Sequence, residues 1–242
     1  MSREPPELSI LVLAFDEEEN VGPVLGELHR WLEGAGLDAE ILVVDDGSRD
    51  GTAEAAAKAL GPRLRRERGR VLRHAHNRGM GAGIKTGARA ARGRWLTFLP
   101  ADGQIPPEAV GVLHDACEGV DAVLSVYADR DDGALRTLLS AGVRGLITAV
   151  HGVRVRSDGP WLVRRTLVDP AQLAPDTFFL NFELPIRLRA AGLRTRTVVV
   201  TVRPRRSGVS KTARPGRALR IAQDLVALRS QRLRELAERW RA

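Results

Sequence analysis

Short apolar runs alternate along the first hundred residues with segments whose apolar positions recur at helical spacing. The runs predict buried strands at residues 8–15, 40–44, 70–74 and 95–99. The segments between them predict helices at residues 21–32, 52–60 and 82–91. Such regular alternation is typical of an α/β protein with a mostly parallel, doubly wound sheet and helices on both faces.

The pattern is less regular in the second half. It predicts a strand at residues 121–127, a helix at 134–150, an edge strand at 159–165, a helix at 178–191, a strand at 194–202 and a basic loop at 203–216. The segment 217–240 predicts an amphipathic basic helix with an apolar face formed by Leu219, Ala222, Val226, Leu233, Leu236 and Trp240. We therefore expect a main domain over residues 1–212 and a C-terminal amphipathic helix over residues 213–242.

Composition supports a globular protein. The chain has 242 residues, 43% of them hydrophobic, which is enough for one buried core and excludes disorder as the main state. A single cysteine, Cys117, excludes a disulfide scaffold and favours a reducing, cytoplasmic setting. No apolar stretch approaches the roughly 18 residues needed to span a bilayer, and the N-terminus lacks the features of a secretory signal.

The positive charge is concentrated near the C-terminus. Residues 203–242 contain 12 Lys or Arg against 3 Asp or Glu, whereas the whole chain has a net charge of +8, so the remainder is nearly neutral. A basic segment of this kind indicates an anionic partner: nucleic acid, a membrane surface or a phosphorylated substrate. Nucleic acid is the weakest of these, because only 4% of the residues are aromatic and stacking platforms are therefore scarce.

Polar and glycine residues follow each of the first four predicted strands. In such a sheet the carboxyl ends of the strands meet at one edge, where ligands usually bind. The candidate residues at that edge are Asp16, Glu17, Asp45, Asp46, Asn77, Gly79, Asp102 and Gln104.

Asp45 and Asp46 are adjacent acids at the end of the second strand. Ser48 and Asp50 have an obvious alternative use in capping the next helix. Two adjacent carboxylates, however, have no capping use for both, and burying like charges is costly. A ligand or a cation is the reason we favour, with a nucleotide base or ribose as the natural partner.

The segment from Asn77 to Gly83 resembles a dinucleotide-binding glycine fingerprint, with Asp102 about 20 residues further on. It lies in the third strand–helix turn, whereas that fingerprint usually occupies the first, whose loop here is acidic. We therefore disfavour a nicotinamide site. The glycines still allow backbone N–H groups to approach a ligand closely.

Asp102 and Gln104 lie two residues apart in a predicted turn after the fourth strand. Their oxygen atoms are suited to Mg²⁺ or Mn²⁺, which also bind the phosphates of a nucleotide. A simple Asp-Gly turn without a metal is an equally good explanation from the residue chemistry alone.

Together these motifs resemble the family 2 glycosyltransferases with the GT-A fold, most closely the polyprenyl-phosphate, dolichyl-phosphate-mannose-synthase-like branch. Residues 14–20 match the opening A-Y-N-E-x-E-N, residues 43–52 match V-V-D-D-G-S-x-D-G-T, and residues 77–81 match N-x-G-x-G. Residues 178–184 and 205–211 match later motifs of the branch. Within the opening motif, Phe15 and Asp16 stand for Tyr and Asn. Three further positions depart from the family: Pro100 replaces the first acid of D-x-D-x-Q, Tyr127 stands near a usual arginine, and Trp161 replaces a cation.

The resemblance implies an inverting transfer from a GDP- or UDP-linked sugar to a polyprenyl or dolichyl phosphate. It implies nucleotide-sugar binding by Ala14, Asp16, Glu17, Asp45, Asp46, Asn77 and Gly79. It implies Asp102 as the catalytic residue, and a weak Mg²⁺ or Mn²⁺ site at Asp102 and Gln104, because Pro100 removes one acid. The acceptor phosphate would contact Arg130, Arg136, Ser140, Arg206, Ser210 and Lys211.

A general base is less clearly indicated. Glu183 stands where hydroxyl-using relatives carry a late acid, but a phosphate monoester is already ionised at neutral pH and needs no base. This favours the lipid-phosphate acceptor. We interpret Arg144, Arg187 and Arg189 as solvated surface charges.

The implied partners are a nucleotide sugar, a polyprenyl phosphate, and the cytoplasmic face of a membrane or a membrane partner protein. The C-terminal helix is suited to lie in a membrane interface, and packing against protein is the alternative. Two other functions remain open. Tyr127 and Trp161 favour a soluble, non-lipid acceptor, and Pro100 favours a catalytically silent nucleotide-sugar binder. The sequence leaves open the sugar, the nucleotide and the oligomeric state.

Overall fold

The structure is a computed structural model that describes residues 4–128, 142, 145–173, 176, 180–204 and 225–230. Within these residues the strands are β1 (Leu8–Ala14), β2 (Ala39–Asp45), β3 (Gly69–Arg73), β4 (Trp95–Pro100), β5 (Ala122–Tyr127), β6 (Leu162–Arg164) and β7 (Thr195–Val200). The helices are α1 (Glu18–Ala35), α2 (Thr52–Glu67), α3 (Met80–Ala90), α4 (Glu108–Asp115), the 3-10 helix η1 (Arg165–Leu167) and α6 (Leu180–Ala190).

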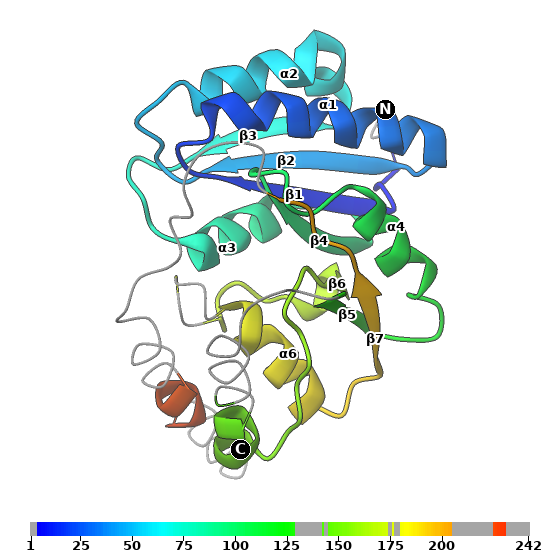
Figure 1. The fold of residues 1–242 in the computed structure, drawn as a ribbon, viewed down its shortest axis with the longest axis vertical. Coiled ribbons are helices and arrows are strands. Elements are labelled where there is room, and N and C mark those ends of the chain that lie inside the picture. Colours follow the sequence, from blue (N-terminus) through cyan, green and yellow to red (C-terminus); the bar gives the residue numbers. More distant parts are fainter. Residues whose placement is uncertain are drawn as a thin grey trace.

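The strands form one sheet in the order β3-β2-β1-β4-β6-β5-β7 (Figure 1). All neighbouring pairs are parallel except those of β6, which is antiparallel to both β4 and β5. The expected α/β fold with a mostly parallel sheet is therefore confirmed. The prediction that residues 159–165 form an edge strand is wrong, because β6 is paired on both sides and β7 lies at that edge instead.

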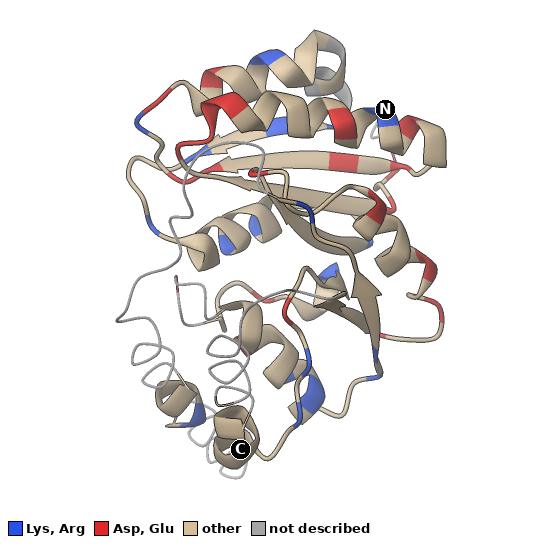
Figure 2. Ribbon diagram, viewed as in Figure 1, with Lys and Arg blue, Asp and Glu red and all other residues tan. Residues whose placement is uncertain are grey.

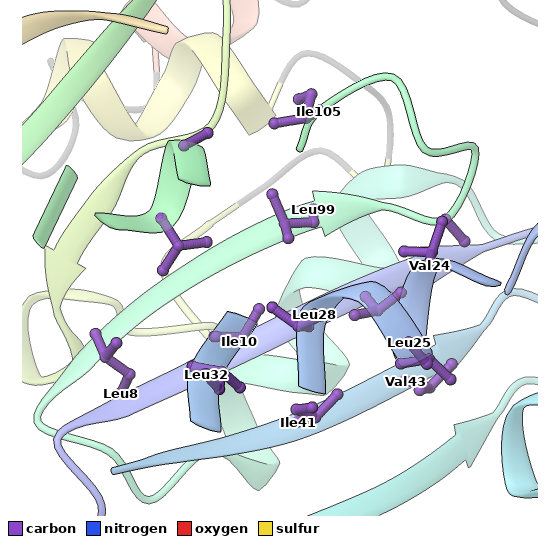
Figure 3. Packing of buried hydrophobic residues seen from close by; sticks show 14 of the residues in the cluster. Leu8, Ile10, Val24, Leu25, Leu28, Leu32, Ile41, Val43, Leu99 and Ile105 are labelled. Atoms are coloured by element: carbon purple, nitrogen blue, oxygen red, sulfur yellow. The ribbon is translucent and has the colours of Figure 1, made fainter. Parts of the chain in front are cut away.

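Alternating side chains on the central strands fill the two faces of the sheet. Leu8, Ile10 and Val12 of β1 pack with α1, α2 and α4, whereas Leu11 packs on the opposite face with α3 and α6. Figure 3 shows the first of these cores, in which apolar side chains of α1 lie against β1 and β2. The period-two pattern of the strands thus produces a core on each side, as expected for a doubly wound sheet.

Glycines allow α3 to approach the sheet closely. A Cβ atom at Gly87 would lie 2.5 Å from Cδ2 of Leu11, and one at Gly83 would lie 3.3 Å from Cδ2 of Leu13. A larger residue at Gly87 would therefore push α3 away from β1. The glycine repeat of this helix has a packing role.

A smaller apolar cluster joins α6 to two other helical segments, residues 145–151 and 225–230. Leu225 and Leu228 are buried in it beside Ile147 and Ile186. Val226, predicted on the apolar face of the C-terminal helix, is 58% exposed. For the part of this helix that the structure describes, the predicted apolar face is thus wrong, since residues 225 and 228 form the packed side.

The remaining differences from the predicted elements concern helices. α4 was not among the predicted helices, although Ala109, Val110 and Leu113 bury one of its sides. α2 continues past the predicted end to Glu67 through a kink at Gly61. The predicted helix at 134–150 is described only in part, and residues 145–151 are helical. Among the described residues, no helix has the length and apolar character required to cross a membrane.

Candidate active site

The carboxyl ends of β1, β2 and β4 lie at the same level of the sheet. The strand register pairs Ala14 with Asp45 and Leu13 with Pro100. The chain is then fastened across the strands, since the N–H of Asp46 donates to the carbonyl of Ala14 and the N–H of Ala101 to that of Leu13, each over 2.9 Å. Acidic positions gather on the loops that follow β1 and β2 (Figure 2).

The acidic loop after β1 is cross-linked to the loop after β2. The N–H of Asp16 donates to Oγ of Ser48, and Oδ1 of Asp16 accepts the N–H of Arg49, both at 2.9 Å. The N–H of Glu17 donates to Oγ1 of Thr52 over 2.8 Å. Asp16 has a φ of 50°, the left-handed region that few residues other than glycine adopt. These bonds hold the loop in that conformation.

Glu17 and Asp50 have structural partners. Oε2 of the buried Glu17 accepts a 2.6 Å hydrogen bond from Nδ2 of Asn20, which is the final Asn of the opening motif. Oδ1 of Asp50 accepts the N–H of Thr52, the first residue of α2. Burial alone would raise the pKa of Asp50, but bonds from Thr52 and from the N–H of Glu18 lower it. Asp50 thus accepts the first N–H of α2, although the N-cap itself is Gly51, which makes no side-chain capping bond. Ser48 does not cap this helix, because its hydroxyl donates to Asp45.

Asp45 is fully buried at the end of β2. Its Oδ1 accepts hydrogen bonds from the N–H and the hydroxyl of Ser48. Nε of Arg73 lies 3.2 Å from Oδ2, an ion-pair distance, but Oδ2 accepts no hydrogen bond from the part of the chain that the structure describes. Oδ2 is therefore a buried carboxylate oxygen held at ion-pair distance from Arg73, whose side chain is 49% exposed, and a ligand group reaches it only where that side chain moves aside.

Asp46 is surrounded by three donors of its own chain. Oδ1 accepts the N–H of Arg78 over 2.9 Å and lies 2.7 Å from Nδ1 of His74, and Oδ2 accepts the N–H of Gly79 over 2.7 Å. On the other side of the His74 ring, Nε2 lies 2.8 Å from Oγ1 of Thr86 in α3. A ligand is therefore not needed to explain the second of the two adjacent acids, because Asp46 fastens the glycine loop to β2.

The glycine loop itself is shaped by backbone geometry. Gly79, the N-cap of α3, has a φ of 96°, and Gly47 has a φ of 72°. A Cβ at Gly47 would clash with the backbone of His76, so only glycine is accommodated there. Asn77 is exposed at the tip of this loop.

The start of α3 is covered by protein groups. The N–H of Ala82 donates to the carbonyl of Asp176 over 3.2 Å, while that of Gly79 is taken by Asp46. These two N–H groups are thus bonded within the chain and do not approach a ligand. Since a dinucleotide fingerprint presents such groups to a pyrophosphate, the nicotinamide site remains disfavoured.

Asp176 also pairs with two cations of α3 and its preceding loop. It forms an ion pair with the buried Lys85, and Nη2 of Arg78 lies 3.5 Å from its Oδ2. Burial alone would raise the pKa of Asp176, but the hydrogen bond and charge of Lys85, with the charge of Arg78, lower it. The ionised carboxylate thus ties the segment before α6 to α3.

Asp102 and Gln104 share a turn after β4. Oδ1 of Asp102 accepts the N–H of Gln104 over 3.1 Å, and Gly103 between them has a φ of 74°. The carbonyl of Gln104 accepts the N–H of Arg203 over 2.7 Å. Both candidate ligands are half-buried, so they remain accessible from solvent.

The donor set of this turn fits a cation that shares its coordination with a substrate. The described part of the chain contains no group of three His, Cys, Asp or Glu side chains that could hold a metal by themselves. Mg²⁺ is commonly bound by one or two carboxylates together with substrate phosphates and water. The oxygen atoms of Asp102 and Gln104 fit that arrangement.

Trp161 and Tyr127, the two remaining departures from the family pattern, pack in or against the core. Trp161 is 0% exposed and packs edge to face on Phe98, with ring centroids 5.2 Å apart. Its expected contribution to the acceptor end is wrong, because this side chain belongs to the core. Tyr127 is partly buried against the core on the other face of the sheet.

Glu183 is fully buried near the start of α6 and forms an ion pair with Arg187, with 2.7 Å between Oε1 and Nε. Arg187 also donates to the carbonyl of Gln172 over 3.0 Å. The interpretation of Arg187 as a solvated surface charge is therefore wrong. Because Glu183 is buried and paired, its surroundings are those of a structural carboxylate.

The predicted acceptor-phosphate residues lie outside the described residues. They are Arg130, Arg136, Ser140, Arg206, Ser210 and Lys211, and their roles remain predictions. Conversely, sequence reasoning missed Arg73, His74, Lys85, Thr86, Asp176 and Arg203. Arg73 and His74 contact Asp45 and Asp46 with their side chains, and Arg203 bonds Gln104 through its backbone N–H. Thr86 supports His74, and Lys85 pairs with Asp176. All of these partners are distant in the sequence, and no local motif marks them.

Comparison with known proteins identifies a family and related enzymes. The sequence profile of the family described as Glycosyl transferase family 2 matches residues 9–169. An undecaprenyl-phosphate 4-deoxy-4-formamido-L-arabinose transferase of Pseudomonas fluorescens is 31% identical over 90% of this chain and 64% of its own length. A dolichol-phosphate mannosyltransferase of Mycosarcoma maydis is 31% identical over 58% of this chain and 51% of its own length. The chain thus spans between half and two thirds of these relatives.

Solved structures show the same fold. Glucosyl-3-phosphoglycerate synthase from Mycobacterium tuberculosis, in complex with Mn²⁺, uridine-diphosphate-glucose and phosphoglyceric acid, has a TM-score of 0.68, with 21% identity over 92% of this chain and 78% of its own. Mannosyl-3-phosphoglycerate synthase from Rubrobacter xylanophilus has a TM-score of 0.71, with 21% identity over 96% of this chain and 75% of its own. At this identity the likeness establishes the architecture alone.

Proposed function

The chain belongs to glycosyl transferase family 2, and from this premise we propose that it transfers a sugar from a nucleotide-sugar donor to the phosphate of a polyprenyl phosphate. The observation that carries the proposal is the convergence, at one edge of the sheet, of the Asp45–Arg73 ion pair at the end of β2 and the oxygen-rich turn of Asp102 and Gln104. The names of the curated relatives support an undecaprenyl or dolichyl phosphate acceptor.

The nucleotide would bind at the carboxyl ends of β1, β2 and β3. Oδ2 of Asp45 would accept an N–H of the base once the half-exposed side chain of Arg73 moves away from it, and the loop of Asp16 and Glu17 would form one wall beside it. Asp46 would act through the loop that it fastens, which carries Asn77 and Gly79. Ala14 would contribute backbone at the end of β1. A site held by so many internal bonds loses little entropy when the donor binds.

Asp102 and Gln104 would hold Mg²⁺ or Mn²⁺ together with the donor diphosphate. The cation would neutralise the charge that develops on the leaving nucleoside diphosphate. The glucosyl-3-phosphoglycerate synthase of the same fold is solved in complex with Mn²⁺ and uridine-diphosphate-glucose, which supports the same pairing of metal and donor here. Pro100 supplies no ligand, so we expect modest metal affinity and a strong dependence on bound nucleotide.

The acceptor would be a phosphate oxygen, which attacks the anomeric carbon while the bond to the diphosphate breaks. A phosphate monoester has a second pKa of about 6 and is mostly ionised at neutral pH, so the attack needs no general base. The burial and ion pairing of Glu183 agree with this proposal. Arg130, Arg136, Ser140, Arg206, Ser210 and Lys211 would neutralise the acceptor phosphate.

We place the protein at the cytoplasmic face of a membrane, either directly or through a membrane partner protein, because a polyprenyl chain resides in the bilayer. Leu225 and Leu228 pack within the protein, so membrane contact would use other sides of the C-terminal segment, such as that of the exposed Val226. The basic residues of this segment favour anionic headgroups. No role in nucleic-acid binding is proposed.

The proposal is tested by incubating the purified protein with undecaprenyl or dolichyl phosphate and a panel of GDP- and UDP-sugars, with and without Mn²⁺ or Mg²⁺. Release of nucleoside diphosphate that requires both the lipid phosphate and the metal is the expected result. Unphosphorylated polyprenol is the matched acceptor control, and Arg136→Ala should weaken acceptor use without changing donor binding. Release with 3-phosphoglycerate instead would identify a soluble acceptor, and donor binding without turnover would identify a silent binder.

A further inference from the structure

The chain that leaves β7 returns across the molecule to the carboxyl end of β4. After Val200 it runs past α4 toward β1 and β4 (Figure 1). There the N–H of Arg203 donates to the carbonyl of Gln104 over 2.7 Å. The last residues before the basic loop are thus bonded directly to the turn that carries the two candidate metal ligands.

The side chain of Arg203 fixes this crossing. Its Nη1 lies 2.5 Å from Oε1 of Glu27 in α1, and its Nη2 lies 3.3 Å from Oε2 of Glu108, the first residue of α4. A planar guanidinium presents donors in a fork, so one arginine can hold two carboxylates at the same time in a defined geometry. Arg203 therefore connects α1, α4 and the turn after β4.

Gln104 is consequently held on both sides of its backbone. Its N–H donates to Oδ1 of Asp102, and its carbonyl accepts from Arg203. Backbone rotation at Gly103 would change the distance between the side-chain oxygens of Asp102 and Gln104. The contacts of Arg203 restrict that freedom without contributing a ligand.

We propose that Arg203 is a positioning residue for the turn of Asp102 and Gln104, the candidate metal ligands, and this inference rests on the proposed function. Pro100 leaves only Asp102 and Gln104 as protein ligands at the end of β4, so each must be placed accurately before the cation and diphosphate bind. Residues that orient metal ligands commonly contribute tenfold or more to metal affinity. The ion pairs of Arg203 with Glu27 and Glu108 have this orienting effect on the turn.

The test is Mn²⁺ binding in the presence of a nucleoside diphosphate, followed by the electron paramagnetic resonance signal of free Mn²⁺. Arg203→Met keeps most of the side-chain length and removes the fork, and we expect about tenfold weaker Mn²⁺ binding. Nucleotide binding without metal and the melting temperature should remain close to those of the unaltered protein, since partly exposed ion pairs add little to stability. Arg196→Met is the matched control, because Arg196 of β7 bonds the carbonyl of Ala116, away from the turn.

Two further variants separate positioning from folding. Arg203→Lys retains the charge but not the fork, and should retain part of the Mn²⁺ affinity. The double variant Glu27→Gln, Glu108→Gln should reproduce the loss caused by Arg203→Met, and adding Arg203→Met to it should cause little further loss. Equal Mn²⁺ affinity in Arg203→Met and the unaltered protein would overturn the inference, as would absence of any Mn²⁺ binding in the unaltered protein. Because binding is measured without acceptor, failure of the proposed sugar transfer would not change this result.

Discussion

His74 and Asp46 form the contact that attaches the loop after β3 to the end of β2. Nδ1 of His74 lies 2.7 Å from Oδ1 of Asp46, and since an ionised carboxylate only accepts, the ring nitrogen is the donor. The ring continues the connection into α3, where Nε2 lies 2.8 Å from the hydroxyl of Thr86. One buried imidazole thus sets the position of the glycine loop relative to the sheet.

Replacing His74 with Ala should therefore affect donor binding. Asp46 would lose one of its three donors and Thr86 would lose its partner, which should cost about 1–3 kcal/mol in the free energy of unfolding. We expect weaker nucleotide binding by calorimetry and a smaller change in acceptor KM. His74→Asn retains an N–H near the position of Nδ1 and should recover part of the affinity. His76→Ala alters an exposed side chain of the same loop and is the control; equal effects of His74→Ala and His76→Ala would contradict the assignment.

Two substitutions at the turn of Asp102 and Gln104 should change the metal dependence of transfer in opposite directions. Asp102→Ala should abolish metal-dependent transfer while leaving the fold intact, because Asp102 is half-buried in a turn. Pro100→Asp restores the first acid of the family motif next to this turn, and should lower the Mn²⁺ concentration needed for half-maximal activity by about tenfold. Titration of activity with Mn²⁺ measures both. If Pro100→Asp leaves the Mn²⁺ dependence unchanged, the cation is not held at the end of β4.

The sequence predicts the strands of this fold well because their signal is local. In β1, Leu8, Ile10 and Val12 face one core and Leu11 the other, and this alternation can be read from the residues alone. The start of α4 also has a readable signal, since Pro107 precedes Ala109, Val110 and Leu113 at helical spacing. The position of β6 has none: a three-residue strand becomes internal only because β4 and β5 lie on both its sides.

The candidate site divides in the same way. The carboxyl ends of parallel strands meet at one edge of the sheet. The sequence pattern therefore predicts that Asp45, Asp102 and Gln104, at the ends of β2 and β4, lie near that edge. The role of Asp46 depends on His74, whose ring must be positioned by the tertiary structure before the contact exists. Trp161 shows the opposite kind of error. Its position in a family motif suggests a side chain that faces the ligand, whereas its apolar ring is buried in the core against Phe98.

A buried carboxylate near the amino ends of β1 and β2, that of Glu40, predicts a pH dependence of stability. Oε1 of Glu40 accepts the hydroxyl of Ser9 over 2.7 Å, and Oε2 lies 3.2 Å from both Nε of Arg92 and Nη2 of Arg70. Burial alone would raise the pKa of Glu40, but the bonds from Ser9 and from the N–H of Arg92, with the charges of Arg92 and Arg70, lower it below its ordinary value of 4.5. The folded state thus favours the ionised carboxylate.

The contribution of Glu40 is therefore present above about pH 4.5 and is lost as the pH falls through the lowered pKa. Glu40→Gln should reduce the free energy of unfolding by about 1–3 kcal/mol at pH 7. The difference from the unaltered protein should shrink as the pH falls below about 4.5. Urea unfolding across this range measures it, with the exposed Glu33→Gln as control. A difference that stays constant with pH would show that the charge of Glu40 is not responsible.

The close packing of α3 on β1 predicts opposite effects for two glycine-to-alanine substitutions. A Cβ at Gly87 would lie within 2.5–3.0 Å of three side-chain carbons of Leu11, which is fully buried. Overpacking of this kind costs about 1–3 kcal/mol, whereas alanine gains only about 1 kcal/mol in helix propensity. Gly87→Ala should therefore lower the free energy of unfolding, and it should also weaken nucleotide binding, because a shift of α3 moves Thr86 away from His74.

Gly34→Ala in α1 meets no atom within 4 Å and should raise stability by about 0.5–1 kcal/mol. Thermal and urea unfolding of both variants measure these effects, and a stabilising Gly87→Ala would show that the glycines of α3 are not required by its packing.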